Sequence, residues 1–254
     1  MYIFYSIMLA NHAVYIHEFI DIRGHHRADY MHHMTANWSP NAQEDRGQLC
    51  YGVWAVLGST GRWPEVVNIW EHDSWDALAD SFAVETVGSG AQDPKLEKWW
   101  ATAADFRRGG VDRLLEPAPW TRTIEQMCAD GVSGQCYAHE LIRVRAGAAA
   151  ELLERVREQG APLAGHHGWQ LAGAWKTAMV DEDEAILLWA IPTWKQWAQF
   201  EKAHAIDPDV RQWRQSLRDI AERWERIVLV DAPLSPFRTG RQPSRDDRVD
   251  WEET

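Results

Sequence analysis

Two segments of the chain carry acid and base side chains in the same order. Tyr15-Ile-His17-Glu18 returns as Tyr137-Ala-His139-Glu140, and an arginine follows each segment, Arg23 in the first and Arg145 in the second. Imidazole and carboxyl groups can transfer protons near neutral pH, and a guanidinium can stabilise an anionic oxygen. We therefore expect acid–base chemistry from His17, Glu18, His139 and Glu140, with Arg23 or Arg145 holding an anionic or enolate oxygen.

The strands that carry these side chains determine where they point. Residues 14–23 and 136–145 alternate in character and are rich in aromatic and β-branched residues, which predicts two strands. Alternate side chains then point to opposite faces. His17 and His139 would face a barrel interior, where burial and a nearby arginine would lower their pKa. The alternative is that both histidines only make structural hydrogen bonds.

Glu18 and Glu140 lie on the other, otherwise aliphatic faces of these strands. A lone buried carboxylate is costly, so each must pair with a cation or stay protonated. A pair would be structural, whereas an unpaired carboxyl that lines a pocket would be a proton donor. The candidate cations are Arg107 or Arg108 for Glu18, and Arg218 or Arg223 for Glu140.

Sixteen tryptophans are several times the usual number for 254 residues. Each brings a large apolar ring and one N–H that needs a partner. They either fill the core between helices and sheet or form the wall of a cavity for a flat, hydrophobic ligand. On the second interpretation, the expected substrate-binding residues are Tyr15, Tyr137, Trp54, Trp70, Trp189 and His72.

The histidine-rich run 25–33 raises the question of a metal site. On a helix, residues seven apart lie roughly 10 Å apart along the axis, so one ion cannot contact both ends of the run. Asp29 with His32 or His33 could form at most a two-residue chelate that needs further ligands. We expect a solvated helix, or one histidine lining an active site, rather than a metal centre.

The landmarks of the first half recur in the second. Asn68-Ile-Trp70 returns as Leu187-Leu-Trp189, and Asp93-Pro94 returns as Asp207-Pro208. Such self-similarity indicates a duplicated architecture. The predicted organisation is an N-terminal arm or extra strand (1–13), a first repeat (14–121), a linker (122–134), a second repeat (135–237) and a mobile C-terminal tail (238–254).

Each repeat shows the same succession of elements. In the first we expect a helix over 25–36, a loop over 37–46, a hairpin from 48–57 to 65–71, helices capped by Ser74 and Asp93, and a strand over 113–116. In the second we expect a helix that ends at Gly160, a hairpin from 169–175 to 185–190, helices opened by Thr193 and Asp207, and a strand over 227–230.

This β-α-β-β-α-β order with one extra helix is ferredoxin-like. Its antiparallel sheet has one bare face that must be covered. Two such units in one chain can cover each other, which predicts an α+β fold in which two repeats form a pseudo-dimeric α/β barrel.

Composition narrows the possible partners and the compartment. The formal net charge of −12, without a basic cluster, argues against nucleic acid and anionic membranes. Three cysteines are too few for a disulfide framework, so we expect reduced thiols in a cytoplasmic protein. The apolar start is too short to span a bilayer. We expect it to be an arm or edge strand, in a protein that forms a homo-oligomer.

The motifs resemble the dimeric α/β-barrel superfamily, and within it NIPSNAP-like and antibiotic-biosynthesis-monooxygenase-like proteins, with two units fused. The strands YIHEFIDIRG and YAHELIRVRAG, the strands NIWEHDSW and LLWAIPTW, and the helix starts DPKLEKWW and DPDVRQW carry the resemblance over residues 14–120 and 135–237. It implies a ligand between a sheet and its helices or inside the barrel. It also implies cofactor-independent oxygenases, isomerases, cyclases, dehydratases or heme proteins as relatives, and the fold does not choose among them.

The resemblance adds one heme alternative. The segment WKQWAQFEKAHA is similar to the helix that supplies the axial histidine in heme-degrading monooxygenases of this superfamily, which would make His204 the axial ligand. The first repeat has Thr86 or Val87 near this position, so a chain would hold at most one heme.

No G-x-S-x-G, P-loop, Rossmann or Cys-x-x-Cys motif is present. The leading hypothesis is an enzyme without a cofactor that uses acid–base chemistry on a small hydrophobic or aromatic molecule in a Trp-lined cavity, as an isomerase, lyase, dehydratase or oxygenase. The alternatives are a heme protein with His204 as ligand and a non-catalytic NIPSNAP-like binding or assembly module.

Overall fold

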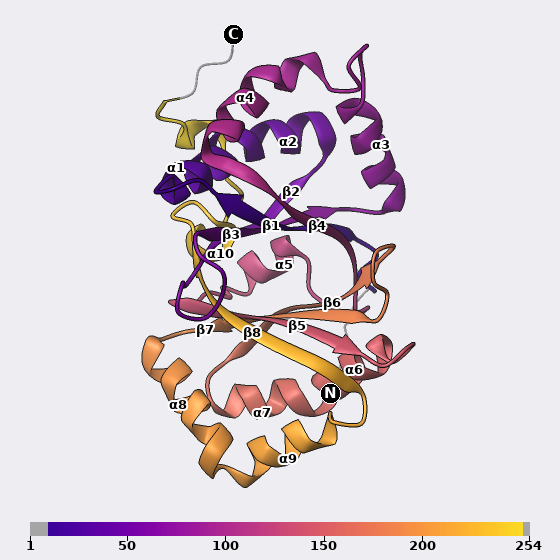
Figure 1. Ribbon diagram of the computed structural model, residues 1–254, viewed down its shortest axis with the longest axis vertical. Helices are drawn as coiled ribbons and strands as arrows, with labels where there is room; N and C mark the ends of the chain where they lie inside the picture. Colours follow the sequence, from indigo (N-terminus) through magenta and orange to yellow (C-terminus); the bar gives the residue numbers. More distant parts are fainter. Residues whose placement is uncertain (1–9, 251–254) are drawn as a thin grey trace, which may run out of the picture.

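The computed structural model describes residues 10–250, and within them eight strands close into one antiparallel barrel (Figure 1). The strand order around the barrel is β1-β3-β2-β8-β5-β7-β6-β4, so the predicted α+β barrel of two ferredoxin-like units is confirmed. The strands are β1 (Val14–Ile22), β2 (Leu49–Val56), β3 (Glu65–His72), β4 (Arg107–Pro117), β5 (Cys136–Val144), β6 (Gln170–Ala178), β7 (Glu184–Ile191) and β8 (Ala221–Asp231).

Helices cover the outer faces of the two sheets, one set on each half (Figure 1). The first half carries α1 (Arg27–His32), the π-turn η1 (His33–Trp38), α2 (Ser39–Arg46), α3 (Trp75–Glu85), η2 (Pro94–Leu96) and α4 (Glu97–Phe106). The second half carries α6 (Ala149–Arg155), the π-turn η3 (Val156–Gly160), α7 (Ala161–His166), α8 (Trp194–Ile206) and α9 (Pro208–Ser216). The remaining short helices are α5 (Ile124–Ala129), α10 (Pro236–Thr239) and η4 (Arg245–Asp247).

Two predicted helix ends were wrong for the same reason. The expected loop over 37–46 is helical, and Gly160 does not end its helix, because in both halves the chain widens into a π-turn and continues. Pro40 and Pro162 fall in the first turn of the helix that follows, where the missing N–H is tolerated. Gly160 serves packing instead, since a Cβ there would lie 2.7 Å from the ring of Trp213.

The predicted helix caps are confirmed. The side chain of Ser74 accepts from the backbone N–H of Ala77, and that of Thr193 accepts from Gln196. Asp93 and Asp207 cap their helices in the same way.

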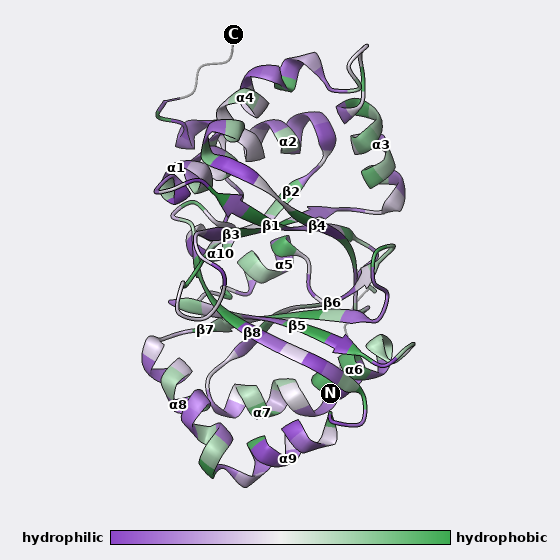
Figure 2. Cartoon of the chain, in the orientation of Figure 1, coloured by the Kyte–Doolittle hydropathy of each residue, from purple (hydrophilic) through white to green (hydrophobic). Residues whose placement is uncertain are grey.

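The strands β4 and β8 begin earlier than predicted. Their first halves are polar and exposed, visible as purple segments in Figure 2, so they lack the apolar alternation of a buried strand. β4 pairs with β6 only over 114–117, and β8 pairs with β2 only over 229–231. The barrel is therefore closed by two short seams.

The centre of the barrel is filled by side chains. The predicted linker contains α5, which lies between the two sheets (Figure 1). Its Ile124 and Met127 pack among the inward-facing residues of both sheets. Trp54 and Trp175 fold back over Gly52 and Gly173, where a Cβ would lie 2.1 Å and 1.8 Å from the rings. Of the two predicted places for a ligand, the barrel interior is therefore occupied at its core by packed side chains of the described residues.

The segment 238–250, predicted to be a mobile tail, instead packs against the first half. The side-chain amide of Gln242 bonds both the N–H and the C=O of Cys50, at 2.9 Å and 2.8 Å. Arg248 donates to the backbone carbonyls of Ala36 and Asn37 in η1. Residues 1–9 of the predicted arm and 251–254 lie outside the described residues, and no helix within 10–250 is long and apolar enough to cross a membrane.

Candidate functional site

The two predicted catalytic histidines meet inside the barrel. The Nε2 atoms of His17 and His139 lie 2.9 Å apart, and both side chains are fully buried. Burial lowers the pKa of His17 well below its usual range and that of His139 to about 3, so both rings are neutral and one donates to the other. Phe19 packs edge-on against both rings. This placement favours the structural interpretation of the pair.

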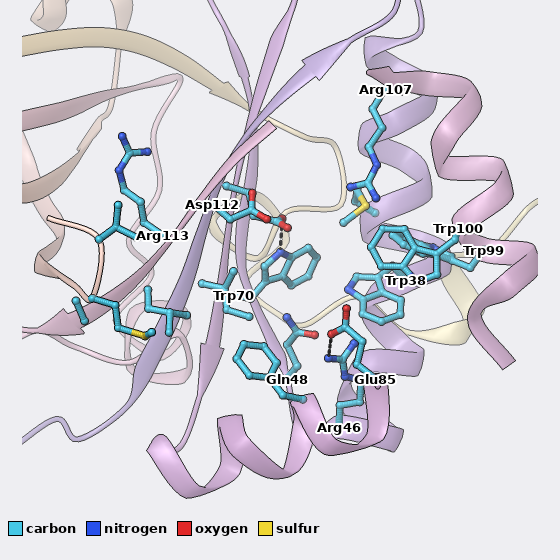
Figure 3. A pocket seen from close by; sticks show the side chains of 18 residues that line it. Trp38, Arg46, Gln48, Trp70, Glu85, Trp99, Trp100, Arg107, Asp112 and Arg113 are labelled. Carbon is cyan, nitrogen blue, oxygen red and sulfur yellow. Dashed lines mark hydrogen bonds and ion pairs between the residues drawn. The ribbon is translucent and has the colours of Figure 1, made fainter. Parts of the chain in front are cut away.

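A cavity of about 360 Å³ lies on the other side of the first sheet, between the strands and their helices (Figure 3). Its size falls in the range of small-molecule sites. Its aromatic walls are Trp38, Trp70, Phe82, Trp99 and Trp100. Its polar groups include Glu18, Gln48, Arg107, Asp112 and the Arg46–Glu85 ion pair.

Three elements place the aromatic walls. The alternation of β3 turns Trp70 to the helix side, and the π-turn η1 presents Trp38 to the cavity. Trp38 and Trp99 of α4 pack with ring centroids 4.6 Å apart, and His33 stacks on Trp99 with ring centroids 5.1 Å apart. The walls are thus held by packed rings rather than by loops.

Glu18 is the half-buried carboxyl of this cavity. Its Oε2 accepts from the Trp70 indole N–H at 2.7 Å and from the Asn68 amide at 2.8 Å. Asn68 also donates to the hydroxyl of Tyr30 at 3.0 Å. Glu18 forms no ion pair with any described residue, and Oε1 accepts no hydrogen bond from them. The carboxyl is therefore positioned by neutral donors and is free to react at one oxygen.

Burial raises the pKa of Glu18, and the neighbouring carboxylate of Asp112 raises it further. The two residues are directly opposed on β1 and β4. Burial also raises the pKa of Asp112, although Arg107 and Arg113 act in the other direction. Two carboxyl groups at one site disfavour double ionisation, so the pair tends to hold a proton. Arg107, whose guanidinium lies 4.6 Å from the ring centroid of Trp100, lines the cavity and acts to lower the pKa of Glu18.

The corresponding carboxyl of the second half is neutralised. Glu140 is opposed on β8 by Arg226, whose Nε lies 2.6 Å from Oε1. Arg226 also pairs with Glu201 at 2.9 Å, and Trp189 donates to Glu140 at 2.9 Å. The expectation of an ion pair was right for Glu140, although neither Arg218 nor Arg223 makes it. For Glu18 the expected pair with Arg107 or Arg108 is absent among the described residues.

The cavity beside Glu140 measures only about 20 Å³, room for about one water molecule and far too small for an organic ligand. His204 lines it, with Nδ1 3.7 Å from Glu201 and the ring packed on Phe200. A heme does not fit at this position. The residues around His204 therefore do not form the axial site that the sequence suggested.

Several other predicted site residues lie away from the cavity. Arg23 and Arg145 are exposed beyond the strand ends, and Arg145 pairs with Glu151, so neither can hold an anion next to Glu18. Trp54 is fully buried in the barrel core. Tyr15 and Tyr137 also point into the barrel, where their hydroxyls donate to Glu71 and Asp231, respectively.

Two of the predicted binding residues belong to the helix side of the sheets. Trp70 lines the large cavity, and Trp189 lines the collapsed one. His72 is fully buried next to the large cavity, and neither of its ring nitrogens has a partner among the described residues.

The residues considered for a metal have other partners. Asp29 bonds His26 at 2.9 Å, His32 bonds Asp250 at 3.2 Å, and His33 bonds the carbonyl of Trp99 at 3.3 Å. No group of His, Cys, Asp and Glu within residues 10–250 has the arrangement of a metal site.

Sequence reasoning missed Asp112, Asn68 and Gln48. Asp112 could have been found by aligning the two repeats, because it aligns with Arg226. The residue opposite the glutamate is therefore negative in the first repeat and positive in the second. Recognising it required the full extent of β4 and β8, which pattern alone did not give.

Comparisons with known proteins support the fold. No protein-family model and no curated protein matches the chain. A protein described as a "putative monooxygenase" from Lactobacillus acidophilus is similar in structure, with a TM-score of 0.58 and 10% identity over 92% of this chain and 97% of that one. An "anthrone oxidase-like protein" has a TM-score of 0.59 and 9% identity over 86% of this chain and 91% of that one.

A NIPSNAP family protein from Agrobacterium tumefaciens is 22% identical and matches 41% of this chain and 94% of its own, with a TM-score of 0.37. The two long matches show that the barrel of two fused units is a known fold.

Proposed function

We propose that this chain is an enzyme without a nucleotide cofactor that removes a proton from a hydrophobic, aromatic substrate bound in the first-half cavity. One observation carries the proposal: Glu18 faces an open, indole-walled cavity without a cation partner, whereas its counterpart Glu140 is paired and its cavity is closed. A carboxyl whose pKa is raised by burial is suited to proton transfer near neutral pH.

The chemical step assigns a role to each side chain. The ionised Glu18 takes a proton from an acidic C–H or O–H of the substrate, and the electron pair stays on the substrate as an enolate or phenolate. Arg107 lines the same cavity and would stabilise the negative charge that develops. Trp70 and Asn68 hold the carboxyl in place through Oε2.

The carbanion can then be reprotonated elsewhere, expel a leaving group or react with dioxygen. These fates correspond to an isomerase, a lyase and a cofactor-independent oxygenase. The third fate is the first to test, because two proteins with this fold are described as a putative monooxygenase and an anthrone oxidase-like protein.

The test uses anthrone, a flat three-ring ketone with an acidic CH₂ group. Exchange of that CH₂ with deuterated buffer under nitrogen, followed by NMR, measures proton removal, and oxygen uptake in air measures the later step. We expect exchange above the buffer rate, reduced at least about 100-fold in Glu18→Gln.

Glu140→Gln is the matched control, assayed at 20 °C with circular dichroism to confirm that it is folded. It should retain exchange within about threefold of the unaltered protein. Equal loss in both variants, or no effect of Glu18→Gln, would contradict the proposal.

A further inference from the structure

The first-half cavity carries a second polar position away from the carboxyl pair. Gln48 lines the cavity and is only 4% exposed, and its Oε1 accepts no hydrogen bond from any described residue. In Figure 3 the indole of Trp70 lies between Asp112 on one side and Gln48 on the other. A buried amide oxygen without a partner costs about 1–3 kcal/mol, and a turn about the last torsion of Gln48 would present this oxygen to a molecule in the cavity.

The backbone holds Gln48 in place. Gly47, with φ of 58°, ends α2 in the left-handed conformation, and the N–H of Gln48 then donates to the carbonyl of Ala42 at 3.0 Å. The adjacent Arg46 is already bonded to Ser81 and Glu85. The guanidinium of Arg46 therefore bonds to Ser81 and Glu85 and makes no hydrogen bond to the Gln48 amide in the described residues.

The surroundings of Gln48 are polar but uncharged overall. The pairing of Leu49 with Glu71 places Gln48 and His72 at neighbouring ends of β2 and β3. Burial, and then Arg46, lowers the pKa of His72 to about 4, so the imidazole is neutral. The charge of Arg46 is balanced by Glu85. A neutral hydrogen-bonding group of a ligand suits this end better than a carboxylate.

The second half lacks this polar position. The paired motifs Gly52-Val-Trp54 and Gly173-Ala-Trp175 align Gln48 with Trp169, and Trp70 with Trp189 aligns His72 with Ile191. Trp169 lines the cavity of about 20 Å³. An amide and an imidazole thus accompany the open cavity, and an indole and an aliphatic side chain accompany the closed one.

We infer that Gln48 determines specificity by hydrogen bonding to an uncharged hydroxyl at the end of the substrate away from the proton that Glu18 removes. The inference rests on the proposed function and adds a substrate class: aromatic compounds with a hydroxyl group at the end opposite their acidic C–H or O–H. A hydroxyl can donate to Oε1 and accept from Nε2, and the amide can turn about its last torsion to present either atom.

The experiment measures binding of two matched two-ring compounds by isothermal titration calorimetry. 2,6-Dihydroxynaphthalene carries a hydroxyl at both ends, and 2-naphthol carries one. Gln48→Leu should weaken binding of the diol threefold- to tenfold and change binding of 2-naphthol less than twofold, as the loss of one hydrogen bond predicts. Gln48→Met serves as a second variant, and Gln170→Leu on the exposed start of β6 is the control that should change neither.

Each outcome decides one of the two ideas. If the unaltered protein binds both compounds and Gln48→Leu weakens both equally or neither, the role of Gln48 is refuted while the cavity stands. If the unaltered protein binds neither compound, the aromatic cavity of the proposed function fails and the inference fails with it.

Discussion

The two halves of the barrel share one scaffold and differ at the residue that faces a glutamate on the first strand of each half. In the first half Glu18 is opposed by Asp112 and opens onto about 360 Å³ of space. In the second half Glu140 is opposed by Arg226 and the space shrinks to about 20 Å³. The same strand position therefore determines whether the carboxyl is available or neutralised.

The difference extends to the side chains around each glutamate. Asn68, which holds Glu18 in the first half, aligns with Leu187, and Phe82 of the open cavity aligns with Glu201, which completes the ion-pair network on Arg226. In the second half Glu140 has an ion-pair partner, whereas in the first half Gln48 and His72 have polar atoms without partners among the described residues. Unpaired polar groups cost folding free energy, which is typical of sites kept for binding.

The largest expected effect comes from breaking the ion pair of the second half. Arg226→Met leaves Glu140 buried without its cation, and we expect the free energy of unfolding in urea to fall by about 3–5 kcal/mol. Asp112 is exposed and opposes Glu18 as Arg226 opposes Glu140. Asp112→Leu should change the free energy of unfolding by less than about 1 kcal/mol. Similar losses in the two variants would refute the contrast between the halves.

Making the first half electrostatically like the second is the next test. Asp112→Arg replaces a like charge beside Glu18 with an opposite one, so the pKa of Glu18 should fall by about 1–3 units. Because the ionised carboxyl is the base, the acid limb of the pH profile for anthrone exchange should move to lower pH by the same amount. Asp209→Arg, an exposed change of equal charge on α9, should leave the profile in place, and a shift to higher pH in Asp112→Arg would contradict the assignment.

The smallest expected effect is a gain in stability when the reactive carboxyl is removed. The pKa of Glu18 is raised in the folded state, so the folded protein binds its proton more readily than the unfolded chain, and stability falls as pH rises through the raised pKa. Glu18→Gln should therefore be more stable than the unaltered protein at pH 8, by roughly 1 kcal/mol, and about equal at pH 4. Thermal melts at the two pH values test this, and a variant that is less stable at pH 8 would show Glu18 to be structural.

Much of the fold could be predicted because the same order of strand and helix patterns occurs in both halves of the sequence. The alternation on β1 and β5 correctly assigned Glu18 to the helix side and His17 to the barrel interior, and the caps at Ser74 and Thr193 gave the helix starts. The continuation of the helices through η1 and η3 was missed, because proline and glycine normally end a helix and only the π-turn lets the chain continue.

The site was only half predictable. Sequence singled out Glu18 and Trp70, since a carboxyl on an aliphatic face and repeated tryptophans are local signals. It could not choose between the barrel interior and the helix side as the place of the cavity, because that depends on how α5 and the inward rings fill the core. Gln48 gave no signal, since its importance comes from a hydrogen bond that it lacks.

Within the described residues, the C-terminal segment forms hydrogen bonds that support the cavity of the first half and not that of the second half. Gln242 bonds to Cys50 as a strand would, and Arg248 bonds to carbonyls of the π-turn that carries Trp38. The aromatic wall at Trp38 is thus supported by residues more than two hundred positions later in the sequence. A displacement of residues 241–248 would therefore change the shape of the open cavity in the first half. The small cavity of the second half would keep its shape.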